Sequence, residues 1–532
     1  MQKGLGHWVE GGHQGHLVWG IFHFRKDYAV ADNGKRFNLE IHPTVFWVSV
    51  GLIVLFVIGT LSNLEQASEI FSAVLGAIAT SAGWFYVLAV NIYLGIVIYL
   101  LFSRYGHIRL GGAEAQPDFS YWGWFSMLFS AGMGIGLLFF SVAEPIYHFG
   151  TPPWGEGGTV AAAELAMSVT FFHWGIHAWG LYGLMALGLA YFAYNRGLPL
   201  TIRSVFYPLI GERIHGGWGN AIDILATVST LFGLATSLGL GAQQVNAGLA
   251  YLFDVSQTTG TQVVLIAAIT GMATLSLVLG LDKGIRRLSQ FNMVAALALL
   301  LFVLFLGPTL RLLDAFVQNI GQYIVQLPRL SLWTEAYQQT EWQHSWSIFY
   351  WAWWIAWAPF VGVFVARISR GRTIREFLLG VLLVPTLMTF AWLTVFGNAA
   401  LFEEMRAGGM VQAVNDDVST ALFVLLDRFP LASLTSGLGI IVVTVFFVTS
   451  SDSASFVVDI ITSGGHPNPP VSQRIFWAMM EGVIAAVLLL GGGLKALQTA
   501  VIVTGLPFAV VLLLLGISLL RGLRQAEGKG TD

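Results

Sequence analysis

The sequence predicts an all-α polytopic membrane protein with twelve transmembrane helices. Its 532 residues are 56% hydrophobic and only 10% charged, and the mean hydropathy is +0.71. A soluble domain needs a charged surface that this composition cannot supply. The chain also divides into twelve apolar segments, each long enough to cross a hydrocarbon core about 30 Å thick. The placement of the basic residues between these segments gives a third indication.

The apolar segments follow one another between residues 43 and 520. They lie near residues 43–62, 83–103, 122–149, 160–194, 220–253, 259–280, 290–310, 344–368, 375–397, 434–463, 471–492 and 496–520. Residues 310–327, LRLLDAFVQNIGQYIVQL, read instead as an amphipathic helix on the membrane surface. The polar residues 1–42 form an N-terminal segment without a cleavable signal peptide, and residues 521–532 form a short tail.

The basic residues concentrate on one side of the predicted spans. If the N-terminus is cytoplasmic, all but five of the 26 lysine and arginine residues fall in cytoplasmic segments. The five that fall outside are Arg311, Arg329, Arg406, Arg428 and Lys495. The positive-inside rule therefore supports twelve spans with both termini in the cytoplasm, in a plasma membrane that we take to be the bacterial inner membrane.

Several function classes are disfavoured by residue types that are missing or scarce. The chain has no cysteine, which excludes a disulfide framework, a thiolate metal site and a cysteine nucleophile. The net charge of −3 argues against a nucleic-acid partner. No cofactor is implied. An intramembrane enzyme is not expected, because His173 and His177 in the fourth segment have no convergent carboxylate in the sequence.

The third apolar segment contains SAGMGIGL, in which Gly132, Gly134 and Gly136 alternate. Glycines at this spacing do not line one helix face, and each weakens a helix by about 1 kcal/mol. We therefore expect a local unwinding, which survives in hydrocarbon only where it lines a cavity. The alternative is that small residues permit close helix packing. The pair Glu144-Pro145 is expected to close this helix.

The tenth segment carries hydroxyl groups within an apolar run, in the sequence FFVTSSDSASF. Hydroxyls and freed backbone carbonyls suit a small hard cation, and secondary transporters place sodium against unwound backbone near the bilayer midplane. The alternative is that the hydroxyls bond back to carbonyls of their own helix. We expect Asp452 in this run to pair with a neighbouring hydroxyl or backbone group and hold the helix geometry, and Glu144 to be structural in the same way.

Two segments concentrate aromatic residues at mid-membrane depth. In the eighth, the run WAWWIAW precedes the cytoplasmic Arg367, which places Trp357 about 15 Å and Trp353 about 20 Å inward at 1.5 Å per residue. The fourth segment, FFHWGIHAWGLYG, spreads three rings over an arc of about 140°, namely Trp174, Trp179 and Tyr182. Two facing aromatic walls predict a box that binds a quaternary ammonium group by cation–π attraction. The alternative is aromatic core packing.

These stretches resemble the betaine-choline-carnitine transporter family. The resemblance is carried by FYWAWWIAWAPFVG with the following ARISRGRTIREF, by GMGIGLLFF with a later EP, and by FHW with a later W and Y in the fourth segment. It runs in order from the first to the twelfth segment. It implies the sodium-symporter architecture of two inverted five-helix repeats, in residues 120–330 with the amphipathic helix and in residues 331–520. Two extra peripheral helices in residues 43–119 precede them, and the family's habit suggests a homotrimer.

The resemblance also implies two sites. The family's substrate box falls on Trp174, Trp179, Tyr182 and Trp354, with Trp353 and Trp357 lining the pathway. Its sodium site falls on backbone at Ser130, Met133 and Phe446 and on the hydroxyls of Thr449 and Ser450. The unwound stretch at Gly132, Gly134 and Gly136 is expected to offer amides to a substrate carboxylate. The family's second sodium site has a hydroxyl where this chain has Leu234, so the number of sodium ions per cycle is not implied.

Together these patterns predict a sodium-coupled importer of a small zwitterionic onium compound, such as glycine betaine or dimethylsulfoniopropionate, that works by alternating access. One alternative is a sodium-independent exchanger of the carnitine and butyrobetaine type. Such exchangers replace sodium with a fixed positive charge, and no Lys or Arg lies in the third, fifth or tenth segment. The other is a proton-coupled choline transporter, and choline-type members that resemble this chain carry an aspartate at the position of Gly136.

Overall fold

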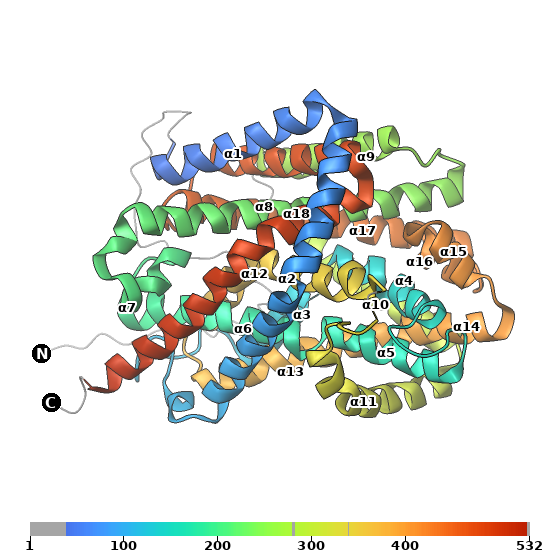
Figure 1. The fold of residues 1–532 in the computed structure, drawn as a ribbon, viewed down its shortest axis with the longest axis horizontal. Coiled ribbons are helices and arrows are strands. Elements are labelled where there is room, and N and C mark those ends of the chain that lie inside the picture. The colour runs from blue at the N-terminus through green and yellow to red at the C-terminus, as the bar shows by residue number, and fades with distance from the viewer. Residues whose placement is uncertain (1–38, 133, 279–281, 339, 529–532) are drawn as a thin grey trace, which may run out of the picture.

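The computed structural model describes residues 39–528, apart from Met133, residues 279–281 and Gln339 (Figure 1). The described chain forms helices joined by loops and turns, and contains no β-strand. The predicted all-α architecture is confirmed. The expectations for residues 1–38, for residues 529–532 and for Met133 as a sodium ligand lie outside the described residues.

The helices follow the chain in the order that Figure 1 labels. The α-helices are α1 (Pro43–Ser62), α2 (Leu64–Phe102), α3 (Tyr121–Gly132), α4 (Ile135–Gly150), α5 (Val160–Trp174), α6 (Ile176–Ala190), α7 (Tyr207–Ile210), α8 (Gly217–Phe253), α9 (Thr259–Val278), α10 (Asp282–Leu306), α11 (Thr309–Leu332), α12 (Phe349–Ile368), α13 (Ile374–Leu393), α14 (Ala399–Ala407), α15 (Met410–Asp416), α16 (Ala421–Leu426), α17 (Ala432–Thr462) and α18 (Val471–Gly528). Short helical turns between them are η1 (Arg104–His107), η2 (Tyr191–Asn195), η3 (Ile202–Phe206), η4 (Gly211–His215), η5 (His344–Ile348), η6 (Thr394–Asn398) and η7 (Val418–Thr420).

The predicted spans are recovered, and some of them are divided differently. Within the described residues, ten helical stretches are long and apolar enough to cross a membrane. One of them lies in α18, which turns at Gly492 and Gly493, so that the predicted segments 471–492 and 496–520 meet at this turn. The predicted segment 122–149 is instead two helices, α3 with 12 residues and α4 with 16. The exact count of twelve spans stays a prediction.

Side-chain caps start some helices, such as α5 and α13, and are missing from α4 and α6. α13 begins with a capping box, in which the Thr373 hydroxyl accepts from the Glu376 amide at 3.2 Å and the Glu376 carboxylate accepts from the Thr373 amide at 2.9 Å. Such caps satisfy amides that have no partner within the helix. α4 and α6 each begin after a glycine, Gly134 and Gly175, with no side-chain cap. No N-cap side chain therefore occupies the first amides of α4.

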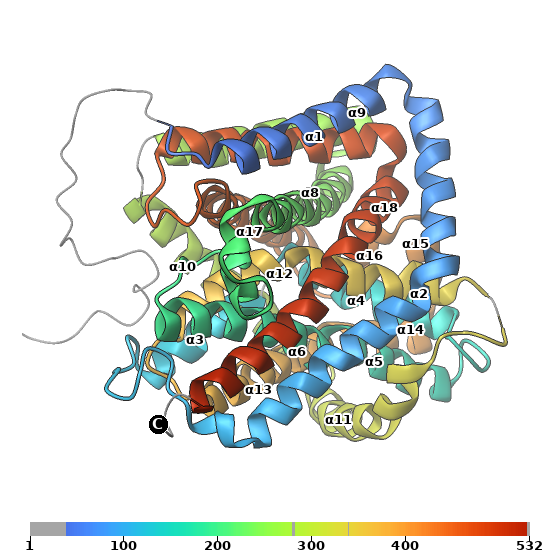
Figure 2. The ribbon, with the colours of Figure 1, turned by 60° about the vertical axis from the view of Figure 1, so that its left-hand side comes forward.

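α12 lies at the centre of the bundle, whereas α1 and α9 lie along one edge (Figures 1 and 2). In the most apolar part of the stretch His344–Ile368, which contains α12, 83% of the residues are buried. The corresponding share is 28% in α1 and 22% in α9. α12 packs mainly against α6, α8 and α18. This position brings the tryptophan-rich run of α12 against helices from the first half of the chain.

The amphipathic segment expected after residue 310 forms α11. Leu312 and Tyr323 are buried, whereas Leu313, Val317 and Val325 are exposed. α11 packs on α5, where Tyr323 contacts Phe171 at 6.3 Å between ring centroids. A helix is present as predicted, whereas its amphipathic character and its place on the membrane surface stay predictions.

Candidate functional site

A helix break lies beside the centre of the aromatic cluster. α3 ends at Gly132 and α4 begins at Ile135, with Gly134 in an extended conformation between them (φ −160°, ψ −178°). The predicted local unwinding is confirmed. Gly136 is packed so closely that a Cβ atom there would lie 2.5 Å from Cη2 of Trp353 and 3.3 Å from Cη2 of Trp174. The first turn of α4 therefore touches the rings of two other helices, and no larger residue fits without moving them.

The prediction that Glu144-Pro145 closes the helix is wrong. α4 continues through Pro145 to Gly150. A proline inside a helix removes one backbone hydrogen bond, but neighbouring helices can stabilise the site in a membrane protein. Here a Cβ on Gly397 would lie 2.8 Å from Cγ of Pro145, which shows how closely η6 packs on the proline. The tight packing holds α4 together across the missing bond.

The predicted segment 160–194 contains a second break, which the sequence analysis missed. α5 ends at Trp174, and α6 begins at Ile176 after the non-helical Gly175 (φ −94°, ψ −144°). The predicted arc of about 140° for Trp174, Trp179 and Tyr182 requires one continuous helix. It is therefore wrong for Trp174, which lies on the other side of the break from Trp179 and Tyr182. A Cβ on Gly175 would lie 2.5 Å from the carbonyl oxygen of Phe171, so this glycine is required by a close backbone approach.

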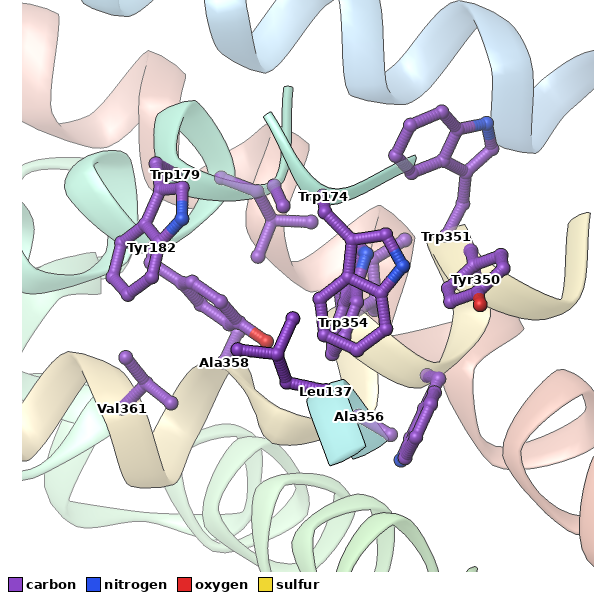
Figure 3. Close-up of a cluster of buried hydrophobic side chains, with 14 of the residues drawn as sticks. Leu137, Trp174, Trp179, Tyr182, Tyr350, Trp351, Trp354, Ala356, Ala358 and Val361 are labelled. Carbon is purple, nitrogen blue, oxygen red and sulfur yellow. The ribbon is translucent and has the colours of Figure 1, made fainter. Parts of the chain in front are cut away.

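The four residues of the predicted box nevertheless meet, through a series of edge-to-face ring contacts (Figure 3). Between ring centroids, Trp174 lies 4.9 Å from Trp354 at 72°, and Tyr182 lies 6.3 Å from Trp354 at 71°. Trp179 lies 5.5 Å from Tyr182 at 70°. All four side chains are buried. Leu137, from the first turn of α4, lies between Tyr182 and Trp354 in this view. Rings from α5, α6 and α12 thus gather around the start of α4.

The four tryptophans of WAWWIAW point in different directions. Trp353 stacks on Trp354 at 5.0 Å, and its indole nitrogen donates to Ser237 Oγ of α8 at 3.2 Å. The indole nitrogen of Trp357 donates to the carbonyl oxygen of Gly233, also on α8, at 2.9 Å. Trp351 points away from Trp354 (Figure 3) and contacts Phe172 at 5.0 Å. Trp354 alone faces the box, Trp353 and Trp357 link the box to α8, and Trp351 is core packing.

A carboxylate that the sequence analysis treated as structural lies directly behind these rings. Glu144 is fully buried, and its Oε1 lies 2.6 Å from Nδ1 of His173. Its Oε2 accepts hydrogen bonds from the Trp174 indole at 2.9 Å and from the Tyr350 hydroxyl at 2.5 Å. The expectation that the histidines lack a convergent carboxylate is therefore wrong for His173. Glu144 and His173 are 29 residues apart, and only the packing of α4 on α5 brings them together.

Glu144, His148 and His173 place their ligand atoms within 4.8 Å of one another. The 2.6 Å separation of Glu144 and His173 is a hydrogen bond. Two ligands of a tetrahedral metal with bonds of about 2.0–2.1 Å would lie roughly 3.3 Å apart. Glu144 and His173 are therefore hydrogen-bonded to each other in this structure, and His148 Nε2 lies 3.4 Å from Oε1 of Glu144.

The residues of the predicted sodium site lie on two helices. Thr449 is half-buried on α17, and its hydroxyl donates to the carbonyl oxygen of Val445 at 3.0 Å, as the alternative interpretation expected. Ser450 is also half-buried on α17, whose Phe446 is buried. Ser130 is exposed, near the end of α3. The structure thus gives the positions of four of the five predicted ligands, and Met133 lies outside the described residues.

Two acidic residues lie close to this part of α17. Asp452 pairs with Arg474 of α18, with Nη2 to Oδ1 at 2.9 Å, so its partner is an arginine and not only a nearby hydroxyl or backbone group. Glu481 of α18, which the sequence analysis did not single out, is fully buried and accepts from the Ser451 hydroxyl at 2.9 Å. Its position within the apolar run FWAMMEGVIAAV was the available signal.

A family model described as betaine/carnitine/choline family transporter matches residues 44–528. The chain belongs to this family. As a member of the betaine/carnitine/choline transporter family it is a multi-pass membrane transporter and not an enzyme, and the resemblance noted in the sequence is confirmed.

Several members of this family are close in sequence over most of the chain. A glycine betaine/proline/choline transporter of Vibrio parahaemolyticus is 47% identical over 505 residues, covering 92% of this chain and 91% of the relative. A glycine betaine transporter of Acinetobacter baylyi is 47% identical over 91% of this chain and 74% of its own length. A probable glycine betaine transporter of Desulfitobacterium hafniense is 44% identical over 91% and 97%, respectively.

Proposed function

We propose that this protein imports a small zwitterion with a methylated ammonium or sulfonium group, such as glycine betaine or dimethylsulfoniopropionate, by sodium-coupled alternating access. The observation that carries the proposal is the meeting of Trp174, Tyr182 and Trp354 beside the start of α4. The names of the three relatives support the substrate class. The proposal includes a homotrimer in the bacterial inner membrane with both termini in the cytoplasm.

The two charges of such a substrate match two different features of the site. A cation is attracted to the faces of aromatic rings, by up to about 2 kcal/mol for each desolvated contact. A carboxylate is favoured at a helix N-terminus, where amides are free and the helix dipole is positive. Gly136, in the first turn of α4, packs against Trp174 and Trp353, so both features lie within one small region.

Sodium is assigned to the oxygens of Thr449 and Ser450 together with backbone at Ser130, Met133 and Phe446. The Thr449 hydroxyl donates its hydrogen to Val445, which leaves its oxygen lone pairs free to face a cation. At the family's second sodium position, Leu234 is buried and has no oxygen to offer in its side chain. We therefore expect coupling through the α17 site.

The competing functions have support of different weight. The Vibrio parahaemolyticus relative is also named for choline and proline, which makes choline the main alternative substrate. Choline has no carboxylate and gains nothing from the free amides at α4, and an acidic partner at position 136 is missing. For the sodium-independent exchanger, the fixed cation would have to replace sodium, yet the third, fifth and tenth predicted segments contain no Lys or Arg.

Uptake into proteoliposomes tests the proposal. The purified full chain is expected to accumulate labelled glycine betaine only with an inward sodium gradient, and unlabelled sulfonium analogue should compete. Replacing sodium by potassium outside is the control. Uptake that is indifferent to sodium and driven by internal carnitine would support the exchanger instead, and robust sodium-independent choline uptake would overturn the assigned substrate class.

A further inference from the structure

We propose that Glu144 is a positioning residue, whose carboxylate fixes the orientation of the rings that hold the onium group; this inference rests on the proposed function. One carboxylate oxygen, Oε2, accepts from the Trp174 indole at 2.9 Å and from the Tyr350 hydroxyl at 2.5 Å. Trp174 lies at the end of α5 and Tyr350 at the start of α12. A single carboxylate oxygen on α4 therefore fixes the orientation of Trp174 and Tyr350, which belong to two other helices.

The second carboxylate oxygen reaches the third ring through His173. Oε1 of Glu144 pairs with His173 Nδ1 at 2.6 Å, and His173 Nε2 lies 2.8 Å from Ser347 Oγ. The His173 ring stacks on Tyr350 at 4.6 Å and 22°. The backbone carbonyl of His173 accepts from the Trp354 indole at 2.9 Å. Trp354 is therefore hydrogen-bonded to His173, which is itself hydrogen-bonded to Glu144.

Ring orientation decides how strongly an aromatic box attracts a cation. The negative potential lies on the ring face, so a ring that tilts its edge toward the substrate loses the attraction while still filling space. Trp174 and Tyr350 lie 5.6 Å apart, and Tyr350 and Trp354 lie 5.7 Å apart. A buried carboxylate is costly unless it is fully hydrogen-bonded, and Glu144 has such partners in these rings and in His173.

Three substitutions separate positioning from charge. Glu144→Leu removes both acceptor atoms and keeps a side chain of similar size. Glu144→Gln removes the charge but keeps one oxygen that can accept from Trp174 and Tyr350. Tyr350→Phe keeps the ring and releases only its bond to Glu144. We expect Glu144→Leu to have the largest effect, Tyr350→Phe a smaller one and Glu144→Gln the smallest.

The measurement compares two ligands by calorimetric titration of the purified full chain. One is glycine betaine, and the other is 3,3-dimethylbutanoate, which has the same shape with a neutral carbon in place of the charged nitrogen. Wild type is expected to prefer glycine betaine by roughly tenfold or more, since cation–π contacts distinguish the two. Glu144→Leu should reduce this preference severalfold, whereas Glu144→Gln should keep most of it.

Asp223→Asn is the matched control. Asp223 is another fully buried carboxylate, on α8, and its ion-pair partner is Arg203 at 2.5 Å. Its substitution should reduce thermal stability and leave the ligand preference unchanged. Substitution of Glu144 would have the same two effects if the role of Glu144 were purely structural. The positioning role alone would be overturned if Glu144→Leu and Tyr350→Phe kept the ligand preference of wild type. It would also be overturned if Glu144→Gln lost as much of that preference as Glu144→Leu. Wild type without any preference for the onium ligand would overturn the proposed function and this inference with it.

Discussion

Trp354 is the residue on which the proposed box depends most. It contacts both Trp174 and Tyr182, and it lies 8% exposed. We expect Trp354→Ala to weaken glycine betaine binding by about 1–2 kcal/mol or more, because a main ring face is lost. Trp354→Phe and Trp354→Tyr should lose less because a ring remains. Calorimetric titration of the purified protein gives the dissociation constants.

Trp351→Phe is the control for that series. Trp351 belongs to the same helix and is also buried, but it points away from the box. It should affect stability more than affinity. Near-wild-type affinity in Trp354→Ala, with correct membrane insertion, would show that the rings are packing and not a site.

Position 136 is expected to decide between zwitterion and choline. An aspartate there would repel a substrate carboxylate by about 1–4 kcal/mol at 4 Å, depending on the local dielectric. We expect wild type not to transport choline appreciably. Gly136→Asp should lose zwitterion uptake and gain some choline uptake, which should increase with pH as the aspartate ionises. Uptake of both labelled substrates across a pH series measures this.

Gly136→Ala separates the charge of the aspartate from its bulk. Any Cβ at this position lies 2.5 Å from Trp353, so both variants must move that ring. The alanine variant should weaken uptake of the zwitterion without admitting choline. If alanine alone produced choline uptake, repulsion would not be the cause.

At the residue scale, the sequence showed the rings but not what holds them. Trp174 and Trp354 stand out because tryptophan is unusual in mid-membrane. Glu144 is equally unusual there, but its partners come from α5 and α12, and no local pattern indicates a contact across 206 residues such as that with Tyr350. Hydrogen-bond partners between helices depend on packing that one helix alone does not encode.

Among the helices, α17 is the one on which the proposed coupling depends. Removing the hydroxyls of Thr449 and Ser450 takes two oxygens from sodium. If each contributes about 1 kcal/mol, as a hydrogen bond does, the double alanine variant should need at least about tenfold more sodium for half-maximal uptake. Ser453→Ala removes a hydroxyl from the same helix that donates to the Thr449 carbonyl at 3.0 Å, and should change the sodium dependence little. An unchanged sodium dependence in the double variant would move the ion site elsewhere.

The two helix breaks differ in how far the sequence could predict them. Three alternating glycines are enough to indicate the break before α4. The break at Gly175 involves one glycine, which helices ordinarily tolerate. It is required by neighbours, since a Cβ there would meet Tyr323 Oη of α11 at 2.9 Å and Phe390 of α13 at 3.1 Å. Those two helices come more than a hundred residues later in the chain.

For the whole molecule, the predicted orientation is directly testable because the chain contains no cysteine. A single cysteine at Thr531, in the tail, should react with a membrane-impermeant maleimide only after the cells are permeabilised. A cysteine at Arg406, which is exposed at the end of α14, should react in intact cells. The opposite pattern would invert the topology, and reaction of both sites in intact cells would place an even number of spans between Arg406 and the tail instead of the predicted three.

The length of α2 bears on how the protein fits into the lipid bilayer. Its 39 residues make a helix about 58 Å long, nearly twice the thickness of the hydrocarbon core. α2 packs on α6 and α18, so lipids with shorter or longer acyl chains would act on the transporter through this helix. We therefore expect the thickness of the host membrane to influence the rate of transport.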